Sequence, residues 1–310
     1  MCKHSQISEE PLTIESVLGR IPAWQGRIGR FASVGGGISN SNWRVWITGE
    51  ATSFFVKIPG RGTEMFINRA VALEASLNAE AAGIGPRVHR LEAPEGVEIV
   101  EFVEGYRTAS NRDFLRGNVR SVVIDAYRKL HASKPLSQTK TVFDMIEEHL
   151  AQIAAVSASM PAATTGLIAA YRQARQSLEA SGLDLVPCFN DPMPGNFLLS
   201  QDDHLVLIDY EYSSNNDRCY DLGAWSTEMF FDRSMDAAMI EDYFGSFDVQ
   251  LMNRVTIYRA LADIKWTLWS VLQNKISALD FDFSKYGLWK HLRARSIIDN
   301  ENWPGLLKEL

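Results

Sequence analysis

The chain of 310 residues has few cysteines and no excess of basic residues. Its three cysteines, Cys2, Cys188 and Cys219, lie far apart and form no C-x-x-C pair, which argues against a disulfide framework and against a zinc site. Lys and Arg number 31 against 38 Asp and Glu, which gives a formal net charge of −7. Because nucleic-acid-binding surfaces are usually basic, this charge argues against a nucleic-acid partner.

Long apolar runs are also lacking. The tryptophan-rich stretch 260–272 is interrupted by Asp263 and Lys265, so it does not have the pattern of a membrane span. Residues 1–6 contain no apolar core of the kind found in signal peptides. We therefore expect a cytoplasmic protein with reduced thiols and no membrane partner. These features carry no information on its oligomeric state.

Two kinds of periodicity divide the sequence and predict an α+β fold. Residues 42–47 alternate between polar and apolar side chains and residues 54–58 form an apolar run, which predicts two strands. Further strands are expected over 88–91 and 96–103. Between them, apolar residues recur at helical spacing over 66–82, and glycines end that pattern. This region therefore predicts a small antiparallel sheet with one major helix.

Helical patterns dominate the sequence after Gly105. Helices are predicted over 119–131, 142–155, 165–180 and 252–276, with a strand over 204–208. The change from strands to helices predicts an N-terminal domain over residues 1–104 and a larger, mostly helical C-terminal domain over residues 105–310.

The residues with the clearest chemistry lie between Cys188 and Asp209. Asp191 is followed five residues later by Asn196, and Asp209 comes directly after the predicted strand. In kinases, residues in this order orient the attacking hydroxyl and hold magnesium. Carboxylate and amide oxygens are hard ligands that suit Mg²⁺. The alternative is a pair of loop aspartates that cap turns, but the complete string favours Asp191 as the catalytic residue and Asn196 and Asp209 as metal ligands.

A second set of residues suits a nucleotide. The segment Gly35–Asn40 lies between residues 31–34 and the strand predicted over 42–47, at the first turn of a predicted hairpin, and glycines such as Gly36 and Gly37 let backbone N–H groups approach phosphate oxygens. Lys57 interrupts an apolar strand, where a kinase places its phosphate-binding lysine. The alternatives are an ordinary hairpin turn and a solvent-facing lysine on an edge strand. The following segment is expected to supply the glutamate that holds this lysine: Glu74, with Glu64 and Glu80 as alternatives.

Aromatic residues form a third group. Trp266 and Trp269 lie three residues apart on a predicted helix and so share one face, where Tyr212, Phe281 and Tyr286 could join them. An aromatic stripe at this spacing is typical of a protein core. The alternative is an aromatic box, because ring faces attract quaternary ammonium ions by roughly 0.5–2 kcal/mol each.

The sequence resembles the choline/ethanolamine kinase family, within the wider group of small-molecule kinases that includes the aminoglycoside phosphotransferases. The resemblance is strongest over Phe189–Glu228 and Trp266–Tyr286 and weaker over Val34–Pro59 and Phe66–Pro86. Its most specific strings are IDYEYSS at 208–214, YDLG at 220–223 and WTLWSVLQ at 266–273.

The resemblance implies a protein-kinase-like fold that uses ATP and Mg²⁺ to phosphorylate the hydroxyl of choline or of a related amino alcohol such as ethanolamine. It implies that Asp191 is the catalytic residue and that Asn196 and Asp209 are the magnesium ligands. The nucleotide-binding residues implied for domain 1–104 are Gly36, Gly37, Ser39, Asn40, Lys57, Glu74 and, at the hinge, Glu101 and Val103. The substrate-binding residues implied for domain 105–310 are Tyr212, Glu228, Trp266, Trp269, Phe281 and Tyr286. Of these, Glu228 would supply negative charge beside the substrate ammonium. The alternative interpretation of Glu228 is an ordinary glutamate on the surface of a helix.

The chain departs from the family pattern at particular positions. Phe189 stands where the family usually has a histidine, and Glu74 lies two residues later than the usual helix glutamate. Two other functions remain as alternatives: an aminoglycoside or thiamine-type kinase with the same machinery, and a non-catalytic nucleotide-binding protein. Because polyamine antibiotics need several acidic contacts, the aromatic residues favour a small cationic alcohol as the substrate.

Overall fold

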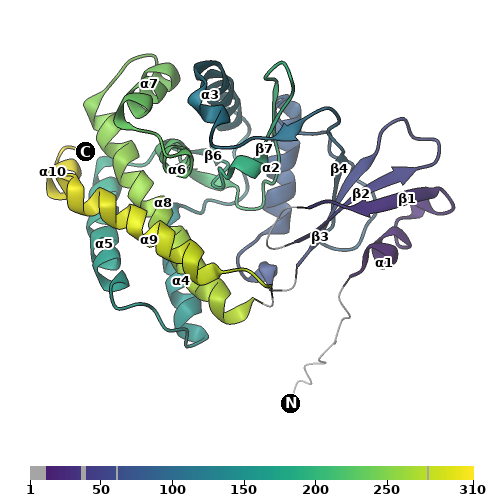
Figure 1. Ribbon diagram of the computed structural model, residues 1–310, viewed down its shortest axis with the longest axis horizontal. Helices are drawn as coiled ribbons and strands as arrows, with labels where there is room; N and C mark the ends of the chain where they lie inside the picture. Colours follow the sequence, from purple (N-terminus) through teal and green to yellow (C-terminus); the bar gives the residue numbers. More distant parts are fainter. Residues whose placement is uncertain (1–11, 36–39, 61, 278) are drawn as a thin grey trace. The chain divides into compact units, whose positions relative to one another are not determined.

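The computed structural model describes residues 12–35, 40–60, 62–277 and 279–310, which divide into two compact units (Figure 1). The first unit comprises Met1–Arg69 and Pro86–Glu104, and the second comprises Ala70–Gly85 and Gly105–Leu310. The predicted domains, residues 1–104 and 105–310, stay predictions, and residues 70–85 group with the second unit.

The first unit is built on a four-stranded antiparallel sheet with the strand order β1-β2-β3-β4. Its elements are β1 (Ile28–Ser33), β2 (Asn40–Ile47), β3 (Phe54–Pro59), β4 (Glu98–Glu101) and the short helix α1 (Ile14–Leu18). Thr13 caps α1, and the buried side chains Val17 and Leu18 of this helix join Val45 and Val56 of the sheet in one apolar cluster. Burial of this apolar surface holds the helix against the sheet.

One predicted strand of this unit is wrong. Residues 88–91 form only a single bridge, between Val88 and Val100. The His89 N–H still donates to Ile99 O at 2.8 Å, but the Leu91 N–H turns back to His89 O at 2.9 Å, which ends the pairing. The local turn at Leu91 prevents a continuous ladder.

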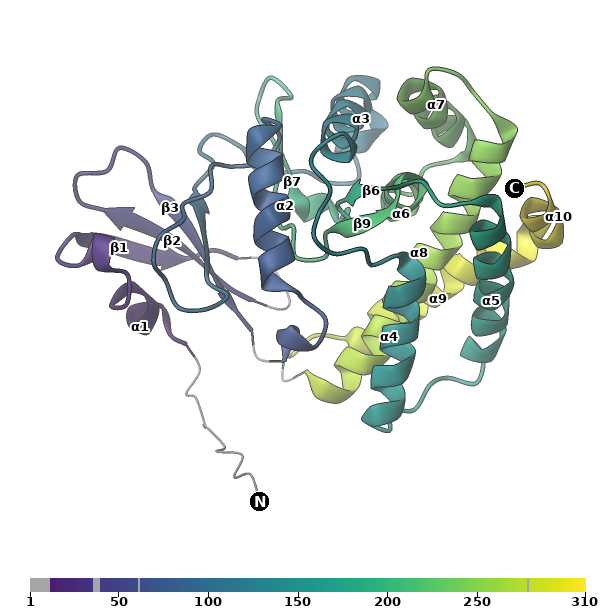
Figure 2. The same ribbon diagram turned by 180° about the vertical axis from the view of Figure 1, so that it is seen from behind.

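The second unit is mostly helical (Figure 2). Its helices are α2 (Arg69–Ala81), α3 (Gly117–His131), α4 (Val142–Ala155), α5 (Thr164–Ser181), α6 (Arg218–Met229), α7 (Arg233–Phe244), α8 (Val249–Ile276), α9 (Phe283–Asn300) and α10 (Trp303–Lys308). The long helix α8 is buried along most of its length, and α4, α6 and α9 pack against it. Val71, Ala75 and Ala79 of α2 belong to the core of this unit, which explains why that helix groups with it.

Short strands connect these helices and hold the loops between them. The strands β5 (Arg107–Thr108), β7 (Phe197–Leu199) and β8 (Leu205–Leu207) form one antiparallel sheet, and β6 (Leu185–Cys188) pairs with β9 (Ser214–Asp217) in another. A small antiparallel sheet in one unit and a larger helical unit confirm the predicted α+β class.

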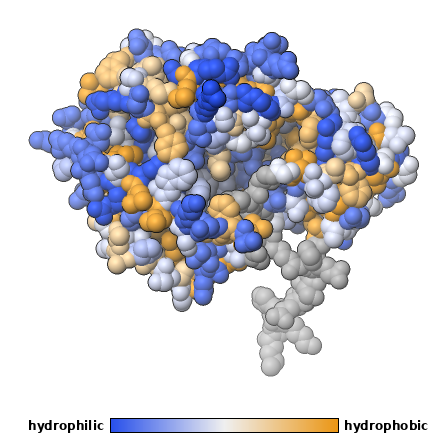
Figure 3. Space-filling model, viewed as in Figure 1, coloured by the Kyte–Doolittle hydropathy of each residue, from blue (hydrophilic) through white to orange (hydrophobic). Residues whose placement is uncertain are grey.

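No helix within the described residues is long and apolar enough to cross a membrane. In the space-filling view, hydrophilic and hydrophobic residues are interspersed over the face drawn (Figure 3).

Candidate active site

The loop between β6 and β7 brings two of the predicted catalytic residues together. Asn196 Nδ2 donates to the backbone oxygen of Asp191 at 3.0 Å and to its carboxylate Oδ2 at 3.2 Å. The other carboxylate oxygen, Oδ1, is buried and has no hydrogen-bond partner among the described residues. A buried acceptor without a partner costs free energy. A bound hydroxyl that donates a hydrogen bond to this oxygen would recover that cost.

Asp209, the third predicted residue, follows β8 and has a left-handed backbone with φ of 70°. The Ile208 N–H donates to Asn196 O at 3.0 Å, which ties this segment to the same loop. Burial raises the pKa of Asp191, Lys265 opposes this rise, and the nearby Asp209 carboxylate adds to it. Asp191, Asn196 and Asp209 therefore lie within electrostatic reach of one another in the second unit, and their chemical roles stay predictions.

Asn190 fixes the backbone just before Asp191. Its φ of 65° lies in the left-handed region, which asparagine tolerates better than most residues. Its side-chain Nδ2 donates to Tyr212 O and to Ser214 Oγ, both at 2.8 Å, and its Oδ1 accepts from Asn216 Nδ2 at 3.0 Å. The loop is thus held by side-chain hydrogen bonds to β9 and to the segment before it.

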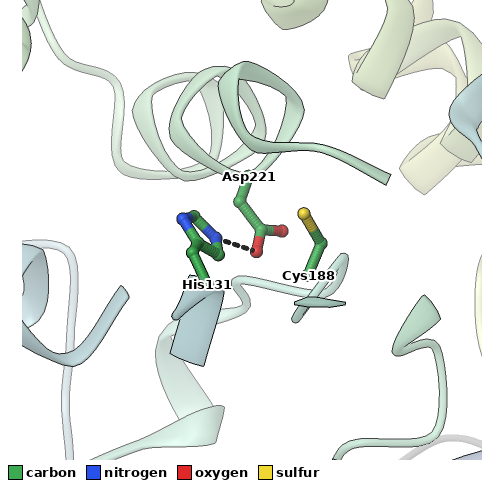
Figure 4. Close-up of side chains that lie close together, drawn as sticks. All are labelled: His131, Cys188 and Asp221. Carbon is green, nitrogen blue, oxygen red and sulfur yellow. Dashed lines mark hydrogen bonds and ion pairs between the residues drawn. The ribbon is translucent and has the colours of Figure 1, made fainter. Parts of the chain in front are cut away.

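Asp221 holds the same loop from the other side. Its carboxylate accepts the backbone N–H of Phe189 at 2.6 Å and that of Asn190 at 2.7 Å. It also contacts His131 Nε2 at 3.1 Å (Figure 4). His131 Nδ1 in turn lies 2.7 Å from Tyr243 OH. Two charge-assisted hydrogen bonds to consecutive N–H groups fix the position of the peptide directly before Asp191.

A metal site is the alternative function for the side chains of His131, Cys188 and Asp221. His131, Cys188 and Asp221 each offer a ligand atom, and these atoms lie within 4.8 Å of one another (Figure 4). However, Cys188 Sγ lies 3.4 Å from Asn216 O as a thiol donor, and burial raises the pKa of this thiol. A cysteine binds metal as its thiolate. The raised pKa and the existing bonds of Asp221 therefore favour a structural role.

Phe189 fills apolar space under the loop. Its side chain is fully buried and packs edge-on against Phe197 at 6.2 Å and Tyr210 at 5.3 Å between ring centroids. The ring lacks the polar atoms of a histidine side chain, but the backbone N–H of Phe189 donates to the Asp221 carboxylate. Packing and this backbone bond therefore fix a loop that a histidine side chain would otherwise support.

The predicted aromatic residues form one continuous cluster. Ring centroids lie 5.3 Å apart for Tyr212 and Trp266, 5.5 Å for Trp266 and Trp269, 5.9 Å for Trp269 and Tyr286, and 6.1 Å for Tyr286 and Phe281. All of these pairs meet edge to face, the geometry that aromatic quadrupoles prefer. Trp266 and Trp269 are buried on α8, whereas Phe281 is exposed. The cluster thus runs from the core to the surface.

Glu228, the acidic residue predicted for the substrate site, has cationic partners within the protein. Its carboxylate contacts Lys290 Nζ and lies 3.3 Å from Arg293 Nη2. Burial raises the pKa of Glu228, but the charges of Lys290 and Arg293 outweigh burial, so the pKa falls below its usual value. The carboxylate is therefore ionised and already balanced, and its role toward a substrate stays a prediction.

The predicted nucleotide-binding residues are divided between the two units. Lys57 is buried on β3, with its Nζ 3.2 Å from Glu98 Oε2 of the neighbouring β4. Glu74, predicted as the partner of this lysine, lies in the second unit and accepts the Ser137 N–H at 2.8 Å. The structure thus supplies Glu98 as a partner that the sequence did not suggest.

The other nucleotide-binding predictions fall at the ends of strands or outside the described residues. Asn40 begins β2, and its Oδ1 accepts the Gly60 N–H at 3.2 Å. Glu101 ends β4, and Val103 follows it. Gly36, Gly37 and Ser39 lie outside the described residues.

A profile of the family described as choline/ethanolamine kinase matches residues 31–243, which is more than half of the chain. The chain belongs to the choline/ethanolamine kinase family. This membership confirms the predicted family and the predicted enzyme class, a phosphotransferase with an alcohol group as acceptor.

Individual members of the family are similar over most of the chain. Protein LicA from Haemophilus influenzae is 29% identical over 259 residues, which cover 79% of this chain and 74% of LicA. The crystal structure of a choline/ethanolamine kinase family protein from Mesorhizobium loti superposes with a TM-score of 0.80 at 28% identity, covering 94% of this chain and 96% of that one. The structure of choline kinase LicA from Streptococcus pneumoniae gives a TM-score of 0.76 at 23% identity, covering 89% and 95%. These similarities confirm the predicted protein-kinase-like fold, and a kinase of this family binds a nucleotide.

Several residues that shape this kinase site were not chosen from the sequence. The hydrogen bonds of Asp221 to the loop span more than 30 positions, which no local pattern reveals. Lys290 and Arg293 are ordinary basic residues on an amphipathic helix until their contacts with Glu228 are known. Lys265 is a charge within an apolar helix, and that unusual placement was the available signal.

Proposed function

We propose that the protein is an ATP- and Mg²⁺-dependent kinase that phosphorylates the hydroxyl of a small cationic alcohol, choline or ethanolamine. One observation supports this more than any other. Asn190, which precedes the predicted catalytic Asp191, donates directly to the backbone of Tyr212, which opens the aromatic cluster. The carboxylate of Asp191, which suits an alcohol, and the aromatic cluster, which suits a cation, are therefore linked within the second unit by the hydrogen bond between Asn190 and Tyr212.

In the proposed reaction, the substrate hydroxyl oxygen forms a bond to the γ-phosphorus of ATP, and the bond from that phosphorus to the bridging oxygen breaks. Asp191 Oδ1 accepts the hydrogen bond of the hydroxyl, orients it, and takes its proton as ADP leaves. The raised pKa of Asp191 favours this role, since a base is most effective when its pKa lies near the working pH.

Asn196 and Asp209 fit a magnesium ion. Because Asn196 Nδ2 donates to Asp191, the amide is fixed with its Oδ1 as the remaining ligand atom, and Asp209 adds a carboxylate. These are hard oxygen donors of the kind that Mg²⁺ accepts beside phosphate oxygens. When bound, the ion would neutralise charge on the nucleotide phosphates. We further propose that Lys57, Asn40, Glu101 and Val103 contribute to nucleotide binding, and that the protein is cytoplasmic.

Magnesium-dependent ADP release should be measured with choline, ethanolamine, thiamine and an aminoglycoside. We expect turnover with choline or ethanolamine at least 100-fold above the rate without acceptor, because a positioned base alone contributes about 10²–10⁴-fold. Chelation of magnesium should abolish this rate. Turnover restricted to thiamine or the aminoglycoside would contradict the proposed substrate, and ATP binding without turnover of any alcohol would indicate a non-catalytic protein.

Replacing Trp269 by leucine should raise KM for the alcohol about tenfold, since loss of one good ring face costs roughly 1.4 kcal/mol of cation binding. KM for ATP should change less than twofold. Trp303→Leu is the matched control, because Trp303 is also buried but lies on α10 outside the aromatic cluster. Equal increases of both KM values in Trp269→Leu would show that Trp269 acts only in packing.

A further inference from the structure

Lys265 lies in the middle of α8 and is among the largest fully buried side chains of the described residues. Its Nζ has no hydrogen-bond partner within the described residues. A buried ammonium without partners costs free energy, so its surroundings must compensate. The compensation comes from aromatic faces, because Nζ lies 3.3 Å from the ring centroid of Trp266 and 4.5 Å from that of Tyr212.

Neighbouring cations are compensated differently. Lys140 Nζ lies 2.6 Å from Glu148 Oε2, and Lys290 contacts Glu228. Within the part of the chain that is described, Lys265 has no such ion pair and interacts with carboxylates, chiefly Asp191, only at longer range. Burial lowers the pKa of Lys265, and Asp191 opposes this effect. The aromatic cluster therefore already contains a cationic side chain of its own.

Tyr212 and Trp266 are two of the rings expected to receive the cationic group of the substrate. We propose that Lys265 is a specificity-determining residue, which makes the site select an amino alcohol with a primary ammonium over one with a trimethylammonium group. This proposal rests on the proposed function, because it names the substrate class of the same site.

The preference follows from how the two kinds of cation are bound. A trimethylammonium group has no N–H, so it depends on ring faces and on the local charge. Lys265 covers faces of Tyr212 and Trp266, and Lys290 Nζ lies 5.0 Å from the ring centroid of Tyr286, which leaves mainly the rings of Trp269 and Phe281 for a quaternary ammonium. A primary ammonium can donate hydrogen bonds to acceptors in the site and therefore loses less when ring faces are occupied.

The test is to compare kcat/KM for choline and ethanolamine in the wild type and in Lys265→Met. The wild type should prefer ethanolamine. Lys265→Met should raise kcat/KM for choline about tenfold or more, the change expected when the ring faces of Tyr212 and Trp266 become free to bind a quaternary ammonium. The value for ethanolamine should change less than about threefold, because its ammonium keeps its hydrogen bonds.

Lys275→Met is the matched control, because it removes the same charge from the protein at an exposed position of the same helix. It should leave both kcat/KM values unchanged. Methionine is long and apolar, so Lys265→Met should melt no earlier than the wild type. If it does not fold, Lys265→Gln serves as the second variant with the same expected direction.

An unchanged ratio of the two kcat/KM values in a folded Lys265 variant would overturn the proposal, as would a loss of choline turnover. Calorimetric titration with choline gives a second readout that does not need turnover. If the wild type phosphorylated neither alcohol, the proposed function would fail, and tighter choline binding by Lys265→Met, by about tenfold, would still support the role of Lys265. Equal choline affinities in that case would overturn both proposals.

Discussion

Replacement of Asp191 by asparagine should lower kcat about a thousandfold and leave ATP affinity within twofold of the wild type, in line with the 10²–10⁴-fold contribution of a positioned base. The asparagine side chain has nearly the same shape, and its oxygen can still accept the bond from Asn196 Nδ2. It cannot take a proton from the substrate hydroxyl. Single-turnover and steady-state assays measure kcat, and calorimetry measures ATP binding.

The structure also predicts what this substitution does to stability. Asp191 is buried, one of its carboxylate oxygens has no partner among the described residues, and burial raises its pKa. Removing its charge should therefore leave the free energy of unfolding unchanged or increase it. Asp202→Asn is the control, because it makes the same change of charge at an exposed position. A kcat for Asp191→Asn within threefold of the wild type would remove Asp191 from the mechanism.

Strong local patterns predicted the helical unit well. The helix expected over 142–155 is observed over Val142–Ala155, where Thr141 and Asp144 form a capping box that marks its start in the sequence. The long helix expected over 252–276 begins slightly earlier, because Asp248 caps it by accepting the N–H groups of Gln250 and Leu251. Periodicity and capping residues act within a few positions, so they can be recognised without knowledge of distant contacts.

The grouping of the predicted site residues could also be inferred, because Asp191, Asn196 and Asp209 are close in the sequence and separated only by short strands. The contacts that position them could not. Asn190 depends on Tyr212, Ser214 and Asn216, which reach it only when β6 pairs with β9. Such long-range polar contacts leave no periodic signal in a single sequence.

Charged residues in buried places were the most difficult to interpret. In the sequence, Asp263 and Lys265 only indicated that their helix does not cross a membrane. In the structure, Asp263 pairs with Arg293 of α9, whereas Lys265 contacts ring faces. The two residues are neighbours on one buried helix, yet their partners lie on different elements, so the pattern alone could not distinguish a structural ion pair from a charge within the site.

Replacement of Asp221 by asparagine should lower both activity and stability. The carboxylate of Asp221 accepts two consecutive backbone N–H groups, from Phe189 and Asn190, and is fully buried. An amide in its place presents an N–H₂ group that cannot accept, so one buried donor loses its partner. We expect the free energy of unfolding to fall by about 3 kcal/mol, measured by urea denaturation.

The loss of activity should exceed what unfolding explains, because the peptide that Asp221 holds leads directly into Asp191. We expect kcat to fall at least about 100-fold at a temperature where the variant is fully folded, since misplacement of a reacting group by about 1 Å has this effect. Asp236→Asn is the matched control. Asp236 is equally buried and accepts hydrogen bonds from Ser226 and Arg259, each at 2.5 Å. These partners lie on α6 and α8, and neither belongs to the loop between β6 and β7 that carries Asp191. It should lose stability and keep its kcat. Equal kcat values in the two folded variants would show that Asp221 stabilises the fold without positioning the loop.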